Sequence, residues 1–83
     1  MSLVDLTKEI IVALCTDKDS VNVKEFDTDD EKTILIEVMV SEEDYGKVIG
    51  KGGHNINAIR TLVQASSFLD NNKYVKINIE CFE

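Results

Sequence analysis

The chain has few of the residues that metal and catalytic centres require. Among its 83 residues are one histidine, no tryptophan, no proline and two cysteines, Cys15 and Cys81. A structural zinc site needs four Cys or His ligands at short spacings, which this sequence does not offer. We therefore expect no metal, no cofactor and no enzymatic activity, and we interpret the two cysteines as small hydrophobic residues.

Long apolar runs and an excess of basic residues are also missing. The longest apolar run, residues 10–15, has six residues, so neither a signal peptide nor a membrane span is predicted, and a cytoplasmic location is expected. The net charge of −7 argues against indiscriminate binding to nucleic acid or anionic lipid. A chain of this length buries only about 60 to 65% of its unfolded surface. We expect one domain over residues 1–83, with binding at its surface.

The charge is distributed unevenly along the chain. Residues 1–44 carry 4 basic and 13 acidic side chains, whereas residues 45–83 carry 5 basic and 3 acidic ones. Between Tyr45 and Leu69 there is no acid, and the basic residues are Lys47, Lys51 and Arg60. A surface that binds anions is therefore expected in this stretch.

Hydrophobic periodicity predicts three helices and three strands. Ser41 is the expected N-cap of the second helix, which ends near Ile49 because glycines follow. The third helix begins at His54 or Asn55, and its apolar stripe is expected at residues 56, 59, 62 and 63. In order, the expected elements are a helix at 3–16, a strand around 21–24, an exposed acidic connection at 27–31, a strand at 33–40, helices at 42–49 and 54–68, and a strand at 74–81.

This order predicts an α+β fold, a two-layer sandwich with three helices on one face of a three-stranded sheet. Two helices separate the second strand from the third, which is enough chain for a parallel pairing. A mixed sheet is therefore expected.

The glycine-rich turn between the last two helices carries the chemistry. Gly50, Gly52 and Gly53 permit strained backbone torsions and remove the Cβ atoms that would keep a ligand away. The turn leads into a helix N-terminus, where free N–H groups and the helix dipole favour an anion, and Lys51 adds a positive charge. A tight turn between two helices also requires glycine without any ligand, so this structural interpretation stays open. A Walker A loop and a dinucleotide fingerprint are both absent.

The run Ile49-Gly50-Lys51-Gly52-Gly53 resembles the Ile-Gly-x-x-Gly signature of the KH domain, whose loop holds about four backbone nucleotides. The expected order of elements is similar to the α-β-β-α-α-β arrangement of the type II KH domain. The resemblance covers the chain from the first helix to the last strand, and length points to the small bacterial single-KH RNA-binding proteins of the KhpA family. Relatives often have a bulkier polar residue at the position of Gly52 and a basic residue at that of His54.

The resemblance implies a site for single-stranded RNA and a role as an RNA chaperone or post-transcriptional regulator. It also implies a homodimer, or pairing with a KH protein of the KhpB (Jag) type, and no membrane. The residues expected to form the RNA site are Lys47, Ile49, Gly50, Lys51, Gly52, Gly53, His54, Asn55, Ile56 and Arg60.

Two other classes of function remain open. The acidic composition favours a protein-interaction or dimerisation module with weak or no RNA affinity. A DNA-binding helix-turn-helix is the second alternative, although Arg60 is the one strong base or phosphate contact on the third helix. Replacing Lys51 and Gly52 with Asp is expected to repel RNA and leave the turn folded, unless Gly52 requires a positive φ.

Overall fold

The computed structural model describes residues 2–82, and its elements follow the expected order. The helices are α1 (Leu3–Leu14), α2 (Glu42–Ile49) and α3 (His54–Asp70), and the strands are β1 (Asn22–Asp27), β2 (Thr33–Val40) and β3 (Tyr74–Cys81). Two 3-10 helices, η1 (Lys18–Ser20) and η2 (Lys51–Gly53), were not expected.

Helix α1 ends two residues earlier than its periodicity suggested, at Leu14. The ammonium group of Lys18 donates to the carbonyl oxygens of Val12 (2.7 Å) and Cys15 (3.0 Å). These bonds satisfy carbonyl groups at the helix end, so the chain turns there at little cost. Helix α3 extends two residues beyond the expected Phe68, to Asp70.

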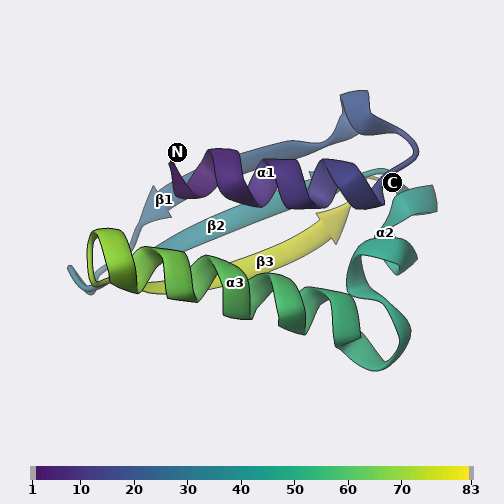
Figure 1. Cartoon of the computed structure of the whole chain (residues 1–83). Helices are drawn as coiled ribbons and strands as arrows, with labels where there is room; N and C mark the ends of the chain where they lie inside the picture. Colours follow the sequence, from purple (N-terminus) through teal and green to yellow (C-terminus); the bar gives the residue numbers. More distant parts are fainter. Residues whose placement is uncertain (1, 83) are drawn as a thin grey trace.

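The sheet has the order β1-β2-β3, with β1 antiparallel to β2 and β2 parallel to β3. Helices α1 and α3 lie side by side over one face, α1 near β1 and α3 near β3, and α2 sits at one end (Figure 1). The prediction of a two-layer α+β sandwich with a mixed sheet is confirmed.

The core is centred on β2, whose side chains alternate between the two faces of the sheet. Ile34, Ile36, Val38 and Val40 point toward the helices, and each is at most 3% exposed. The helices complete this core with Ile11, Val48 and Val63, all fully buried. The alternation of β2 therefore decides which face of the sheet the helices cover.

The expected apolar stripe of α3 was wrong at one position. Ile56, Ile59, Val63 and Ser67 face the core, whereas Leu62 is 57% exposed. Successive helical residues are rotated by about 100°, so Leu62 lies well to one side of Val63 and outside the buried face. An apolar residue thus remains on the surface of α3.

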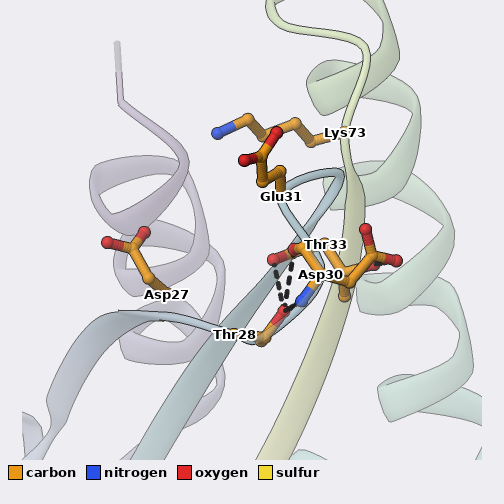
Figure 2. A pocket seen from close by; sticks show the side chains of 6 residues that line it. All are labelled: Asp27, Thr28, Asp30, Glu31, Thr33 and Lys73. Atoms are coloured by element: carbon orange, nitrogen blue, oxygen red, sulfur yellow. Dashed lines mark hydrogen bonds between the residues drawn. The ribbon is translucent and has the colours of Figure 1, made fainter.

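The connection between β1 and β2 is an exposed acidic turn, as expected (Figure 2). The Thr28 hydroxyl donates to the carbonyl oxygen of Thr33 (2.9 Å) and accepts from the N–H of Asp30 (3.1 Å). The Lys32 N–H and the Thr33 hydroxyl donate to the Asp30 carboxylate, which lowers the pKa of Asp30. Lys73, which precedes β3, lines the same hollow as these side chains.

A buried carboxylate joins the end of α1 to the start of α2. The side chain of Asp44 is fully buried, and its two oxygens accept hydrogen bonds from the N–H groups of Thr16 and Asp17, both at 2.9 Å. The hydroxyl of Ser41 also donates to this carboxylate (3.0 Å) and accepts from the Asp44 N–H (3.3 Å) as the N-cap of α2. Sequence analysis identified no partner for Asp44, because Thr16 and Asp17 are distant in the chain.

The hydrogen bonds to Asp44 stabilise its charged form. The N–H of Thr16 makes the largest contribution, followed by Asp17 and Ser41, with Lys47 adding a smaller electrostatic effect. Together they outweigh burial, which acts in the opposite direction, and lower the pKa of Asp44 to about 2. Protonation of this carboxyl would therefore weaken the junction between α1 and α2.

We predict that the Asp44→Asn substitution lowers the melting temperature at neutral pH, because an amide cannot accept hydrogen bonds at both former carboxylate oxygens. The pKa of Asp44 is about 2 in the folded protein, compared with the ordinary value of 3.8 that applies to an unfolded chain. The stabilisation by its charge is thus complete above about pH 4 and is lost as the pH falls to about 2. Thermal unfolding at several pH values, followed by circular dichroism, measures this effect.

The matched control is Glu43→Gln, which neutralises an exposed carboxylate in the same helical turn. Between about pH 5 and about pH 2, the loss of stability is expected to be smaller in Asp44→Asn than in the control, because the variant has no carboxylate at this position to protonate. Parallel pH profiles for the two variants would contradict the assignment.

Candidate functional site

The turn between α2 and α3 depends on glycine at its first position. Gly50 has φ 76° and ψ 169°, a conformation that side-chain-bearing residues rarely adopt. A Cβ atom there would lie 2.8 Å from Cγ and 2.9 Å from the backbone nitrogen of Asn55. Gly50 therefore allows the start of α3 to pack directly against the end of α2.

The side chain of Asn55 closes this turn. Its Nδ2 atom donates to the carbonyl oxygen of Lys47 at 2.7 Å, which ties the first turn of α3 to the last turn of α2. Ile56, 5% exposed, and the half-buried Ile49 anchor the two flanks in the core. The turn is thus held from both sides.

The outer part of the turn presents backbone donors to solvent. The N–H of Gly53 donates to Gly50 (3.1 Å) and that of His54 to Lys51, whereas the N–H groups of Lys51 and Gly52 donate to no acceptor within residues 2–82. Two neighbouring free donors therefore lie at the N-terminus of the 17-residue α3, where the helix dipole is positive.

Two exposed side chains flank these donors: the positively charged Lys51 at the tip of the turn and the imidazole of His54 at the first position of α3. The turn therefore presents donors and a positive charge on its outer side. This arrangement suits an anion such as a phosphate group.

Lys47 and Arg60, expected in the same site, have partners elsewhere. The ammonium group of Lys47 donates to the Thr16 hydroxyl (2.6 Å) and lies 3.5 Å from the Asp44 carboxylate. Arg60 Nη2 donates to the carbonyl oxygen of Ile77 in β3 (3.2 Å). The turn thus brings together residues 49–56, while Lys47 lies toward α1 and Arg60 lies two turns along α3.

A groove between α3 and β3 was missed by sequence analysis. It has a volume of about 470 Å³ and is lined by Arg60, Thr61, Gln64, Ala65, Phe68 and Val75. The only sequence signal was an i, i+4 spacing of polar residues on α3, which is also typical of an ordinary solvated helix face. The groove exists because α3 lies along the free edge of β3.

Residues 2–82 contain neither a group of metal-ligating side chains nor a membrane-spanning helix. No three His, Cys, Asp or Glu side chains in this part of the chain are grouped as metal ligands. None of the helices described has the length and apolar character needed to cross a membrane. Burial raises the pKa of the Cys15 thiol, and neither this cysteine nor Cys81 forms a disulfide within the described residues.

Two bacterial proteins illustrate the similarity in sequence. The chain is 41% identical over 71 residues to the RNA-binding protein KhpA of Caldanaerobacter subterraneus subsp. tengcongensis, covering 86% of this chain and 92% of that protein. It is 37% identical over 79 residues to the RNA-binding protein KhpA of Chlamydia caviae, covering 95% of each chain.

Two solved structures of Era contain a region with the same fold as this chain. Era of Aquifex aeolicus, in its complex with GDP and AlF4−, aligns with a TM-score of 0.67 and 19% identity over 95% of this chain and 29% of Era. An Era complex with MgGDPNP and nucleotides 1506–1542 of 16S ribosomal RNA aligns with the same score. The present chain thus corresponds to less than a third of Era, and at this identity the likeness concerns the fold alone.

The family model described as KhpA/KhpB, KH domain, matches residues 4–79. This range includes all elements except the first residue of α1 and the last two residues of β3. The matched range contains the glycine turn and both helices that it joins. With this fold, this turn and these relatives, the chain belongs to the KhpA/KhpB KH-domain family.

Proposed function

We propose that this protein binds single-stranded RNA through the turn at residues 50–53. The observation that carries the proposal is the pair of free N–H donors at Lys51 and Gly52, next to the N-terminus of α3. Such donors bind a phosphate oxygen without reading the base, and the neighbouring glycines allow the sugar-phosphate backbone to come close. Base discrimination then falls to the surface of α3.

The charge distribution supports an RNA site at this turn. No acidic residue occurs between Tyr45 and Leu69, although the whole chain has a net charge of −7. Of the three carboxylates in the first turn of α2, Asp44 is buried and already accepts hydrogen bonds from backbone groups. A negatively charged strand is therefore least repelled along α3.

A role as a cytoplasmic RNA chaperone or post-transcriptional regulator, rather than as an enzyme, agrees with this surface. The relatives are named RNA-binding proteins. His54 is exposed at the first position of α3. The proposed activity is thus binding, with RNA released unchanged.

We also infer that the protein forms a homodimer through α3. Ala58, Leu62, Ala65 and Leu69 are all exposed, with Leu62 at 57% and Leu69 at 87%, and their spacing of four, three and four places them in one line along the helix. This line is that of a helix–helix seam. Beside it, an apolar groove of about 490 Å³ between α1 and α3 includes Ile10, Ala13 and Leu14.

Electrostatics favour a second copy on this surface. Two chains that each carry −7 repel one another, and the repulsion is smallest where both present α3, whose one acid, Asp70, is its last residue. Small alanine side chains also allow the two helices to approach closely. A KhpB-type partner is the alternative occupant of the same seam.

RNA affinity is expected to depend on the charge at the glycine turn. The Lys51→Asp, Gly52→Asp double variant is expected to raise the Kd for a short labelled single-stranded RNA by about 10-fold or more, because two carboxylates replace a cation near the phosphates. Fluorescence anisotropy at a fixed salt concentration measures it.

The matched control for this experiment is Lys51→Asn, Gly52→Asn. Gly52 has φ 64°, so both variants place a side chain in the left-handed region, where Asp and Asn are similarly tolerated. The nearest atom to a Cβ at this position is 3.7 Å away, which leaves room for it. Equal affinity of the Asp and Asn variants, with both folded, would contradict the role of charge at this turn.

The oligomeric state is expected to depend on Leu62. Leu62→Asp is expected to shift dimer dissociation to at least about 10-fold higher concentration, because a charge would be buried in the seam. Sedimentation equilibrium measures it, with Phe26→Asp on the opposite face of the sheet as control. If the wild-type chain is monomeric in isolation but binds a KhpB-type protein through Leu62, the homodimer is contradicted and a heterodimer takes its place.

A further inference from the structure

We propose that Phe68 and Tyr74 form a base-stacking subsite for the same RNA strand, at the end of the α3–β3 groove away from the glycine turn. This inference rests on the proposed RNA binding. It adds the minimum length of the strand and a stacking position for the base at its end. The subsite lies outside the residues 47–60 to which sequence analysis assigned RNA contacts.

The two rings form an exposed aromatic pair. Their centroids are 5.4 Å apart at an interplanar angle of 82°, and Phe68 is 44% and Tyr74 58% exposed. In an edge-to-face pair the edge of one ring meets one face of the other, so further ring faces remain free for stacking. Base–aromatic stacking uses such a face and accepts every base.

The groove connects this pair to Arg60. Phe68 is one of its lining residues, together with Arg60, Gln64 and Val75. Its walls are joined before any ligand binds: Gln64 Nε2 donates to the carbonyl oxygen of Lys73 (2.9 Å), and the Val75 N–H donates to Gln64 Oε1 (2.9 Å). A strand entering the groove would thus meet a preformed surface, which lowers the entropic cost of binding.

The distance along α3 gives the length of RNA required. Phe68 lies 15 residues after Gly53, which corresponds to about 22 Å at a rise of about 1.5 Å per residue. A strand stacked at about 3.4 Å per nucleotide would need roughly six nucleotides to cover this distance, and a splayed strand fewer. The glycine turn and the aromatic pair can therefore hold the two ends of one short strand.

Charge supports RNA in the groove and limits its extent. Arg60 is the only charged side chain among the lining residues, and none of them is acidic. Beyond Tyr74, Lys73 lies with Asp27, Asp30 and Glu31 around the β1–β2 turn (Figure 2). These acids would repel a strand that continued past the aromatic pair, so the pair marks the end of the footprint.

The test compares Phe68→Leu and Tyr74→Leu with wild type on two single-stranded RNAs, one about half the length needed to reach the aromatic pair and one that exceeds it. On the long RNA each variant is expected to bind at least about 5-fold more weakly, the lower limit for loss of one stacked base. On the short RNA both are expected to match wild type. Phe26→Leu, which removes a ring of similar exposure from the opposite sheet face, is the matched control.

A spectroscopic variant gives an independent readout. The chain contains no tryptophan, so Tyr74→Trp introduces a single indole with a larger stacking surface. It is expected to bind the long RNA at least as tightly as wild type, with quenching of its fluorescence, and to show no quenching with the short RNA. Circular dichroism verifies that all variants are folded.

The outcomes separate this subsite from the glycine turn. If Phe68→Leu and Tyr74→Leu bind the long RNA like wild type while Lys51→Asp, Gly52→Asp does not, the subsite is refuted and the proposed function stands. If neither RNA binds wild type, both proposals fail. If the leucine variants lose self-association instead of RNA affinity, the rings contact protein and the stacking proposal is overturned.

Discussion

The parallel pairing of β2 with β3 is the constraint on which the rest of the structure depends. A chain leaving β2 at Val40 must return to the opposite end of the sheet before β3 begins, because Tyr74 pairs with Thr33. Helix α3 makes this return: its 17 residues span about 26 Å, close to the length of an eight-residue strand at about 3.3 Å per residue. The N-terminus of α3 is therefore placed at the end of the sheet where β2 ends.

The same constraint explains why the glycine turn is where it is. Helix α2 carries the chain away from β2, and the turn at Gly50 reverses it directly into α3 (Figure 1). Gly50 and Asn55 make this reversal possible at close range, one by lacking a side chain and the other by donating to Lys47. The bonds that hold the turn use the N–H groups of Gly50 and Gly53 and the side chain of Asn55, and leave those of Lys51 and Gly52 free within residues 2–82.

Asp44 is a buried acid whose charge is compensated within the fold. Two N–H groups from the segment after α1 donate to its carboxylate. The same carboxylate attracts Lys47, which is thereby held toward Thr16. One buried acid thus stabilises the α1–α2 junction and at the same time fixes the position of a basic residue that the sequence associates with RNA.

Local pattern alone predicted the order of the helices and strands, the covered face of the sheet and the glycine turn. Both bounds of β2 and β3 follow from residue alternation, and the turn follows from its glycines, because these signals lie within a few neighbouring residues. Tertiary structure decided the exposure of Leu62, the partners of Asp44, Lys47 and Arg60, and the groove with its aromatic pair. Each of these depends on which segments, distant in the chain, pack together, and hydrophobic periodicity shows that a face is buried without showing what it is buried against.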